Sequence, residues 1–408
     1  MAPKKTPTKL YFYLLCHFLL KGIQNPKELI KNFESAKKII YLKGISNAKE
    51  ILFFDYLPKN YLLKTKLHIK EPSYSIFKKL SGIFGKDKFQ ASPPQTTEGM
   101  ATQQKILVIR SGAMGDVLLA TPIIRKLYQD RNGFCDIHIA TRYSEIFNNN
   151  PYVSKIIKPK DLKNLKEPYD LIINLDMALE KNKAAHITHV YSFYAFGSQS
   201  KFESINLQAE LFSTPQDVKK IVCFIKDFSK GYIVCHNRID PSQPYRNVPL
   251  NDWQTLLTSI ANKTNKTIIQ VGMPDMDVAI THPFIVDARG KFTLHELKEL
   301  ISHADLFLGT DAGPLHIAAS TETPILSFFT LAHHDTRKPL RHNKEHLFKA
   351  ITPQVDCYGC AKDYPLPWGF DCRRRDFACT QNFNIQEAID ASIKLLNDKS
   401  LVLELRPQ

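Results

Sequence analysis

Residues 105–127 read KILVIRSGAMGDVLLATPIIRKL. Their order, a short apolar run followed by a turn and an amphipathic stretch, recurs through the rest of the chain. Residues 105–110 form a short apolar run, which predicts a buried β-strand. A turn with two glycines follows, and then an amphipathic helix is expected from about residue 116 to residue 129. A strand, a glycine turn and a helix in this order are typical of an α/β fold with a parallel sheet.

The same alternation continues along the chain and restarts once. Strands are expected at residues 135–140, 153–157, 169–175, 231–235, 267–271, 306–309 and 324–329, and helices at 250–263, 294–303 and 313–320. Two such runs predict two doubly wound, Rossmann-like domains, residues 105–228 and 229–408. Because ligands of these folds gather at the carboxyl ends of the strands, the active site is expected in the cleft between the domains.

The first hundred residues carry most of the basic charge. They hold 18 lysines, no arginine and 7 acidic residues, which accounts for +11 of the net charge of +15. We interpret residues 1–84 as a basic helical extension and residues 85–104, rich in Pro and Thr, as a linker. An anionic membrane surface and a merely solvated helical face are both open explanations. Nucleic acid is not an expected partner, because arginine clusters with interleaved aromatic residues are missing.

Residues 10–20 are the most apolar stretch of the chain, but no run reaches the 18 residues that a membrane-spanning helix needs. We interpret this stretch as a buried or interfacial helix. The protein is accordingly expected in the cytoplasm, either free or peripherally bound to the inner membrane.

The first candidate for chemistry is the turn between residues 110 and 116. Gly112 and Gly115 allow backbone N–H groups to approach a ligand closely. Asp116 falls near the start of a helix, where a carboxylate is stabilised as the anion, and an ionised carboxylate in a cleft can act as a general base. The alternative is an ordinary helix cap.

Two further candidates lie in the second domain. Residues 309–316 read GTDAGPLH at a strand-to-helix corner, where Thr310 and Asp311 would border a nucleotide-sugar and His316 would reach a phosphate or ribose. Arg246, in the loop PYRNVP, would offset the charge of a departing diphosphate. The competing readings are a simple turn, a histidine bonded to its own backbone, and a solvated surface arginine.

Together these motifs resemble glycosyltransferase family 9, the heptosyltransferase family of Gram-negative lipopolysaccharide synthesis, over about residues 105–396. The resemblance implies a GT-B fold, an inverting reaction and no cofactor in catalysis. It implies that Asp116 is the base and Arg246 the second catalytic residue. It places Gly112, Gly115 and Arg142 on the acceptor side. The donor side would comprise Thr310, Asp311, Ala312, Gly313, Pro314 and His316.

The function that the resemblance implies is transfer of a heptose from ADP-heptose to a glycolipid or lipopolysaccharide core acceptor. Two alternatives stay open: another nucleotide-sugar with a different acceptor, and a non-catalytic binding protein with the same fold. Three positions depart from the family pattern, because Arg246 replaces the usual Lys, Val248 the usual Trp, and Ala312 a Ser or Thr. These departures concern the identity of the donor more than the type of reaction.

Four cysteines cluster near the C-terminus, namely Cys357, Cys360, Cys372 and Cys379. A C-x2-C pair with two further cysteines nearby suits a structural Zn²⁺ bound by four thiolates, which leaves no open position for catalysis. A local disulfide and free thiols are the alternatives.

Overall fold

The computed structural model describes residues 103–404, except residues 177, 179–181, 183–184, 198–204, 239, 241–242, 276, 364–371 and 373. The chain separates into Met1–Phe89 and Gln90–Gln408, and every described residue belongs to the second unit. The predicted helical extension and nearly all of the predicted linker lie outside the described residues. In the described part of the chain, we find no helix with the length and apolar character that a membrane crossing requires.

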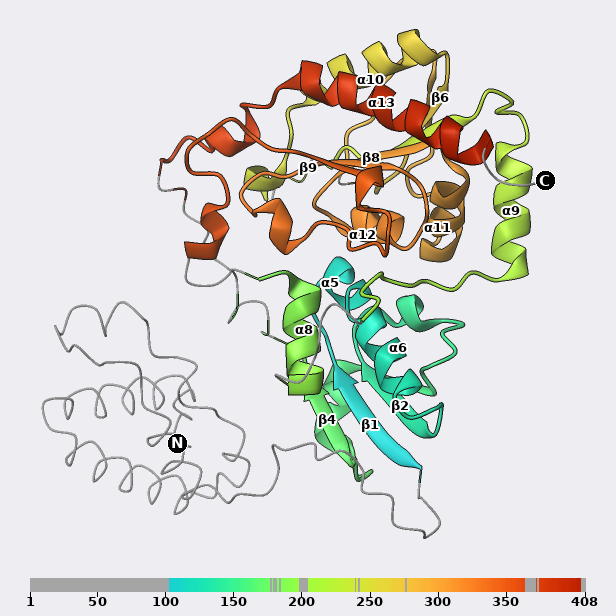
Figure 1. Ribbon diagram of the computed structural model, residues 1–408, viewed down its shortest axis with the longest axis vertical. Helices are drawn as coiled ribbons and strands as arrows, with labels where there is room; N and C mark the ends of the chain where they lie inside the picture. The colour runs from blue at the N-terminus through green and yellow to red at the C-terminus, as the bar shows by residue number, and fades with distance from the viewer. Residues whose placement is uncertain are drawn as a thin grey trace, which may run out of the picture. The chain divides into compact units, whose positions relative to one another are not determined.

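The first lobe is built on a four-stranded sheet of order β3-β2-β1-β4, in which every strand pair is parallel. Its strands are β1 (Gln104–Ile109), β2 (Cys135–Ala140), β3 (Lys155–Ile157) and β4 (Leu171–Asn174). Its helices are α5 (Met114–Leu118), α6 (Thr121–Gln129) and α8 (Ile187–Phe196), with short 3₁₀ turns at Ser144–Phe147 and Pro159–Asn164. Figure 1 shows this lobe below the second one.

The single helix predicted for residues 116–129 is wrong, because the chain forms α5 and α6 instead. The break has a local cause at Pro122, which lies in the first turn of α6. Proline has no N–H to donate to the carbonyl of Leu118, and its ring would collide with that carbonyl in a continuous helix. The hydroxyl of Thr121 donates to the Leu118 carbonyl instead, at 2.8 Å.

The second lobe has a six-stranded parallel sheet of order β10-β9-β8-β5-β6-β7. Its strands are β5 (Tyr232–Cys235), β6 (Thr267–Gln270), β7 (Ile285–Asp287), β8 (Leu306–Thr310), β9 (Ile325–Phe328) and β10 (Phe348–Ile351). Its helices are α9 (Pro215–Ile225), α10 (Leu250–Thr264), α11 (Leu294–His303), α12 (Gly313–Ala319) and α13 (Ile385–Glu404). Among its described residues it also has the 3₁₀ turns η7 (Pro244–Arg246), η8 (His334–Thr336), η9 (Glu345–Leu347), η10 (Cys360–Asp363) and η11 (Ala378–Thr380).

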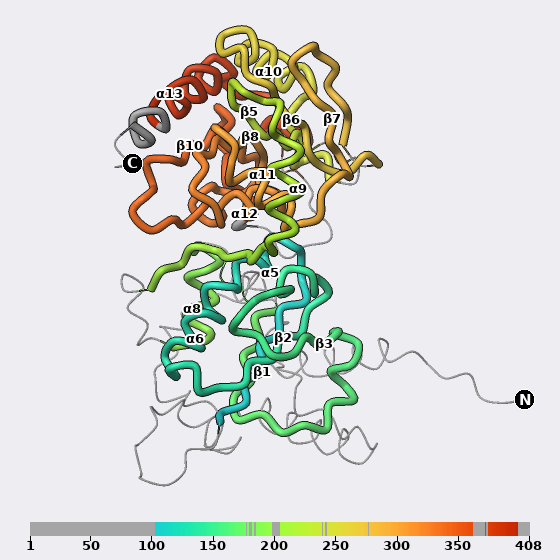
Figure 2. The backbone as a smooth tube through the Cα atoms, turned by 90° about the vertical axis from the view of Figure 1, so that its right-hand side faces the viewer, coloured from blue at the N-terminus to red at the C-terminus, as the bar shows by residue number. Residues whose placement is uncertain are grey.

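Both sheets have the strand order of a doubly wound fold, so the predicted pair of Rossmann-like domains is confirmed. Helices α10 and α13 pack together, whereas α9 and α12 pack against α11 (Figures 1 and 2). The predictions did not include β7 and β10. Both are short strands at the edges of the sheet and only partly buried, so neither has the continuous apolar run of the central strands.

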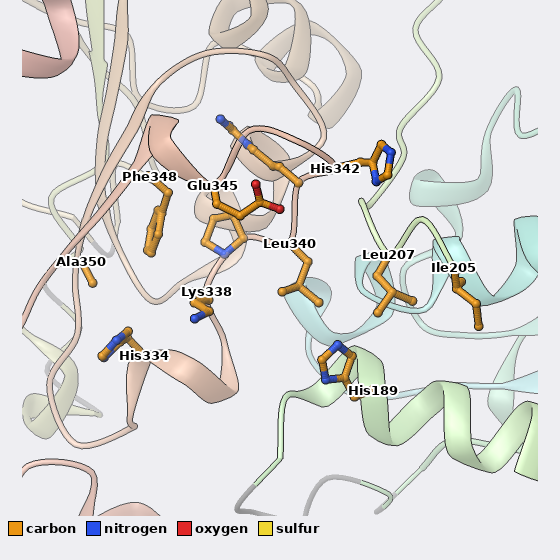
Figure 3. A pocket seen from close by; sticks show the side chains of 12 residues that line it. His189, Ile205, Leu207, His334, Lys338, Leu340, His342, Glu345, Phe348 and Ala350 are labelled. Carbon is orange, nitrogen blue, oxygen red and sulfur yellow. The ribbon is translucent and has the colours of Figure 1, made fainter. Parts of the chain in front are cut away.

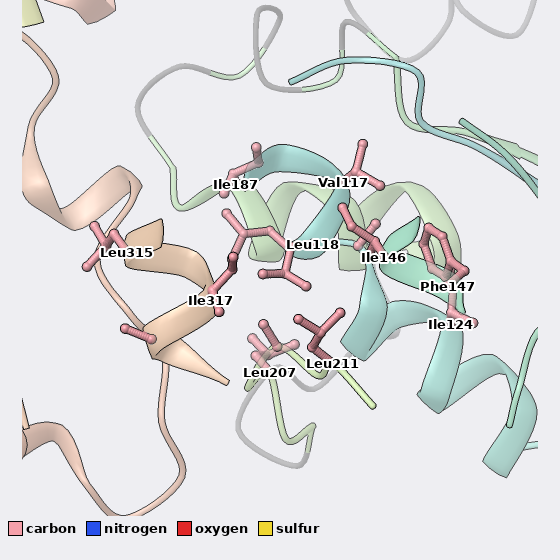
Figure 4. Packing of buried hydrophobic residues seen from close by; sticks show 14 of the residues in the cluster. Val117, Leu118, Ile124, Ile146, Phe147, Ile187, Leu207, Leu211, Leu315 and Ile317 are labelled. Atoms are coloured by element: carbon pink, nitrogen blue, oxygen red, sulfur yellow. The ribbon is translucent and has the colours of Figure 1, made fainter. Parts of the chain in front are cut away.

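One hydrophobic core continues from the first lobe into the second. Leu118 of α5 lies beside Ile317 of α12, and Leu207 and Leu211, from the segment that connects the lobes, pack next to them (Figure 4). All four side chains are at least nine-tenths buried. Because buried apolar contacts are close-packed and resist deformation, this shared core holds the helices that begin at the two predicted corners in one arrangement.

Candidate active site

The corner between β1 and α5 places Asp116 in a network of arginines. Its Oδ2 accepts a hydrogen bond from Nη2 of Arg110 at 2.6 Å, and its Oδ1 accepts one from Nη1 of Arg337 at 2.8 Å. The Asp116 side chain is 13% exposed. The cap alternative is wrong, because Ala113 occupies the N-cap position of α5 and no side chain caps that helix.

A second carboxylate supports the same corner from β4. Asp176 accepts hydrogen bonds from the backbone N–H of Ser111 at 2.8 Å and from Nη1 of Arg110 at 3.4 Å. Gly112 leaves room for this arrangement, because a Cβ at that position would lie 2.7 Å from Nη2 of Arg110. Arg142 is exposed beside the turn, and its Nε donates to the carbonyl of Ser111 at 2.9 Å.

The corner between β8 and α12 gathers the predicted donor-side residues. Thr310 is the buried last residue of β8, Ala312 is the N-cap of α12, and Pro314 lies in the first turn. Since Ala312 has no hydroxyl, no side chain caps this helix. Within the described residues, Oγ1 of Thr310 and Nδ1 of His316 have no hydrogen-bond partner. The alternative in which His316 bonds to its own backbone is therefore wrong.

Arg246 joins this second corner. Its guanidinium donates to the carbonyl oxygen of Asp311 and lies 3.6 Å from the Asp311 carboxylate, while Nη1 donates to the Gln243 side chain at 3.3 Å. Arg246 is thus held against Asp311 and is not a free surface arginine. The structure brings the second and third predicted motifs together.

The two corners also touch one another. A Cβ on Gly115 would overlap the ring of His316, and a Cβ on Gly313 would overlap the end of the Met114 side chain. Each glycine thus receives a side chain from the opposite lobe, so α5 and α12 lie directly side by side, as both views show (Figures 1 and 2). The close approach, rather than the turn conformation, is what requires glycine at these two positions.

Gly115→Ala is expected to lower stability by about 1–3 kcal/mol, because the buried His316 ring has little room to move aside. Gly313→Ala is the matched control, since it also places a methyl group in the first turn of a helix. There the clash is with the flexible end of Met114, so we expect a smaller loss. Chemical denaturation of both variants measures the difference. Equal losses would show that the His316 contact does not restrict Gly115.

Both corners lie where their sheets reverse strand order. Arg110 and Asp176 follow β1 and β4, which are neighbours in the first sheet but not consecutive in the chain. Arg246 and Asp311 follow β5 and β8, which are related in the same way in the second sheet. Such switch points are where doubly wound folds bind ligands, and here the two face each other.

The charges at the site set the protonation of its two central groups. Burial favours a higher pKa for Asp116, but the positive charges of Arg337 and Arg110 outweigh it and hold this pKa below its ordinary value. Burial lowers the pKa of His316 to about 4 despite the neighbouring Asp311 and Asp116 carboxylates. At neutral pH the site therefore holds an ionised Asp116 and a neutral His316.

Stability is expected to fall as the pH drops from about 6.5 towards 4. Burial lowers the pKa of His186 to about 3 and that of His316 to about 4, below the ordinary 6.5, so the unfolded chain binds more protons than the folded one in this window. The melting temperature of His186→Gln should depend less on pH than that of the wild type. His346→Gln, at an exposed position, is the control and should leave the dependence unchanged.

Sequence reasoning missed Arg337 and Asp176 and did not give Arg110 a role. Arg110 stood inside the first motif, and Asp176 directly follows a predicted strand, so a search for charged residues at strand ends would have found both. Arg337 had no such signal. It follows η8 in a loop, and only the tertiary fold brings it to Asp116.

The four clustered cysteines are free thiols close enough to influence one another. Burial and the neighbouring thiols of Cys360, Cys357 and Cys372 raise the pKa of Cys379 to about 12. Burial disfavours the Cys372 thiolate, but backbone N–H groups of residues 374–377 donate to its sulfur and bring its pKa below the ordinary value. Among the described residues, three potential ligand atoms come within 4.8 Å of one another only at His333, His334 and Asp335.

Residues 246–362, which include Arg246 and the whole β8–α12 corner, match the model of glycosyltransferase family 9 (heptosyltransferase). This part of the chain is similar to glycosyltransferase family 9. A stretch of 61 residues of this chain is 43% identical to lipopolysaccharide heptosyltransferase 3 of Escherichia coli. That stretch covers 15% of the chain and spans only 18% of the length of the relative.

Solved structures of glycosyltransferases share the architecture. The ADP-heptose lipopolysaccharide heptosyltransferase II of E. coli superposes with a TM-score of 0.54 at 14% identity, over 73% of this chain and 100% of that one. The iron-containing dodecameric glycosyltransferase TibC of enterotoxigenic E. coli H10407 gives 0.53 at 14% identity, over 73% and 77%. At this identity the likeness concerns the fold, and it confirms the predicted GT-B type.

Proposed function

We propose that this chain transfers a sugar from a nucleotide-sugar donor to an acceptor hydroxyl with inversion at the anomeric carbon. The proposal depends mainly on one observation. The carboxylate of Asp116, at the switch point of the first lobe, lies next to the corner of Asp311, Gly313 and His316 in the second lobe. A base and a phosphate-binding corner on opposite walls are what a single displacement needs.

In the proposed reaction, Asp116 takes the proton of the acceptor hydroxyl while its oxygen forms a bond to the anomeric carbon. The bond from that carbon to the diphosphate oxygen breaks on the opposite face, and the electron pair leaves with the nucleoside diphosphate. Arg246, held against Asp311, stabilises the charge that develops there. Asp116 can accept a proton while paired with Arg110 and Arg337, because a carboxylate offers about four acceptor sites.

We further propose ADP-heptose as the donor and a glycolipid or lipopolysaccharide core as the acceptor. The names of the E. coli relatives support this assignment. Ala312 stands where the resemblance would lead one to expect Ser or Thr, so the N-cap of α12 has no hydroxyl to offer a donor. Another nucleotide-sugar is therefore an alternative donor. The lysine-rich residues 1–84 would bring the cleft to an anionic lipid surface, a role that their charge alone supports.

The test of the proposed donor is a thermal-shift panel of nucleotide-sugars that includes ADP-heptose, followed by assay of donor consumption. A ligand that binds the native state at 100 times its Kd stabilises it by about 2.7 kcal/mol. We expect one nucleotide-sugar to raise the melting temperature and to be consumed when acceptor is present. A donor that binds but is not consumed with any acceptor would favour the non-catalytic alternative. If no donor stabilised the protein, both the transferase and the non-catalytic binding protein would be excluded.

We also propose that Cys357, Cys360, Cys372 and Cys379 hold a structural metal ion, Zn²⁺ or iron. The other three thiols raise the pKa of Cys379 and backbone N–H groups donate to Cys372, which supports a thiolate site, and one structural neighbour contains iron. No three of the four sulfurs lie within 4.8 Å of one another in this structure, so the loop has to draw them together around the ion. Elemental analysis should find a stoichiometric metal that Cys379→Ser loses and that Cys223→Ser, at an exposed position on α9, retains. A stable wild-type protein with no metal and four reactive thiols would rule this site out.

A further inference from the structure

The loop that follows η8 in the second lobe reaches the first lobe beside the proposed base. Two contacts fix this loop to its own lobe. The backbone N–H groups of Arg337 and Lys338 both donate to the carbonyl of His334, at 2.9 and 2.7 Å. Farther along, Nη2 of the buried Arg341 donates to the carbonyl of Ala318, at the end of α12, at 2.9 Å. Between these anchors, Arg337 and Lys338 contact the first lobe.

Two side chains of the first lobe hold this loop. Asp116 accepts a hydrogen bond from Nη1 of Arg337 at 2.8 Å. One residue farther along the loop, the carbonyl of Lys338 lies 2.9 Å from Nε2 of His186, the N-cap residue of α8. His186 is only 5% exposed. Both contacts cross from one lobe to the other, so the first lobe holds two successive residues of the loop.

The hydrogen bonds of His186 determine which of its ring nitrogens carries the proton. Nδ1 accepts a hydrogen bond from the backbone N–H of Thr188 at 3.1 Å, so it bears no proton. A neutral imidazole then carries its proton on Nε2, which donates to the Lys338 carbonyl. Burial lowers the pKa of His186 to about 3, so this arrangement persists at neutral and mildly acidic pH.

Side-chain packing does not fix this loop against α8. A cavity of about 500 Å³ lies between them. Figure 3 shows Lys338 and Leu340 of the loop on one side of the cavity, and His189 of α8 with Leu207 on the other. Side chains on opposite walls of such a cavity lack van der Waals contact with each other. The hydrogen bond from His186 therefore supplies a contact that packing does not provide there.

The position of Arg337 matters because Asp116 is surrounded by charged and titratable groups. These are Arg337 of the loop, Arg110 after β1, His316 of α12 and, in contact with Arg110, Asp176 and Tyr191. Burial favours a higher pKa for Asp116, and Arg337 opposes this effect more strongly than Arg110 does. Because Arg110 also pairs with Asp176, Arg337 is the cation whose displacement would affect Asp116 most.

We propose that His186 is a positioning residue for the reaction: by holding the Lys338 carbonyl, it keeps Arg337 of the second lobe against the carboxylate of Asp116. His186 then acts on catalysis through Arg337 and without touching the substrate. This inference rests on the proposed role of Asp116 as the base, because only in that case does the placement of Arg337 affect sugar transfer. It makes the protonation of a group in one lobe depend on the position of a loop from the other.

Two substitutions of His186 separate its two hydrogen bonds. His186→Gln keeps an N–H group near the place of Nε2, which can donate to the Lys338 carbonyl, but it loses the bond to Thr188. His186→Asn keeps an oxygen that can accept from the Thr188 N–H, but its side chain is too short to reach Lys338. Asn is among the preferred N-cap residues, so this variant is expected to fold. His186→Ser, another preferred N-cap, is the substitute if it does not.

The direct test is an NMR titration of the Asp116 carboxyl in the full-length protein with isotope-labelled aspartate. Asp116→Asn identifies the signal, which is missing from that variant. We expect the pKa of Asp116 to rise in His186→Asn, because Arg337 moves away, and to stay near the wild-type value in His186→Gln. Arg337→Met should raise this pKa as well. The double variant of His186→Asn and Arg337→Met should raise it no further than Arg337→Met alone, because both changes act on one contact.

The kinetics of transfer provide a second readout. His186→Asn is expected to lower kcat by about tenfold or more, since a small misplacement at an active site can cost about 10²-fold. The acid limb of its kcat/KM profile should also move to higher pH, because the base is protonated earlier as the pH falls. His186→Gln should keep most of the activity and the wild-type limb. A purely structural role for His186 would lower activity without moving this limb.

Three results would overturn this inference. They are an unchanged pKa of Asp116 in His186→Asn, a larger rise in the double variant than in Arg337→Met, and equal behaviour of His186→Asn and His186→Gln. A raised pKa in His186→Asn, together with no sugar transfer by the wild type, would contradict the proposed transferase but not the positioning of Arg337. Normal transfer by His186→Asn with an unchanged pKa would contradict only the role of His186.

Discussion

Asp116→Asn is expected to reduce sugar transfer by about 10²–10⁴-fold, the range that a general base contributes, and to leave donor affinity nearly unchanged. The asparagine amide cannot accept the acceptor proton, but its oxygen can still take a hydrogen bond from Arg110 or Arg337, so the corner keeps its shape. Steady-state transfer and equilibrium binding of the same nucleotide-sugar, measured on the same preparation, separate the two effects.

Asp176→Asn is the matched control for this variant. Asp176 also accepts a hydrogen bond from Arg110, and its substitution by Asn removes the same negative charge. It bonds to Nη1 of Arg110 and to the N–H of Ser111, however, whereas Asp116 bonds to Nη2. We expect a clearly smaller loss of transfer. If both variants lose transfer equally, the two carboxylates act by orienting Arg110, and Asp116 is not the base.

Arg246→Gln is expected to lower kcat by about 10²–10³-fold, the loss seen when one preorganised donor to a developing charge is removed. The reason is its position, since the guanidinium is already held against Asp311 and needs no rearrangement when the leaving group becomes charged. The loss should appear in kcat more than in KM, because the charge on the leaving oxygen is largest in the transition state.

Arg246→Lys is the conservative partner of that variant. Lysine keeps the positive charge at this position, so we expect it to keep most of the activity that glutamine loses. A glutamine variant with nearly normal kcat would remove Arg246 from the reaction. A lysine variant as poor as glutamine would instead show that the bidentate shape of arginine is required.

Both corners could be predicted from sequence because each is formed by residues that are close together in the chain. A strand, a glycine turn and a helix follow one another within about a dozen residues at 105–118 and again at 306–319. The position of Asp116 and Asp311 at the ends of parallel strands follows from that order alone. The two-lobed fold followed from the repetition of the same unit, which is the least ambiguous pattern in the chain.

The residues that complete the site are not local. Arg337 reaches Asp116 across 221 positions of sequence, and Arg341 becomes a buried cation only because α12 and the loop after η8 pack together. No periodicity marks either residue, and each looks like a surface arginine in the chain. The short edge strands β7 and β10 were not predicted for a related reason, because each forms only by pairing with a neighbouring strand that is already in place.

The central claim is that the two facing corners catalyse a single displacement on a nucleotide-sugar. A time-resolved NMR assay of donor and product with the full-length protein tests it most directly. We predict that one nucleoside diphosphate is released for each glycoside formed, and that the anomeric configuration of the product is opposite to that of the donor. Retained configuration would contradict the account, and so would a donor that binds at these corners but is never transferred to a saccharide hydroxyl.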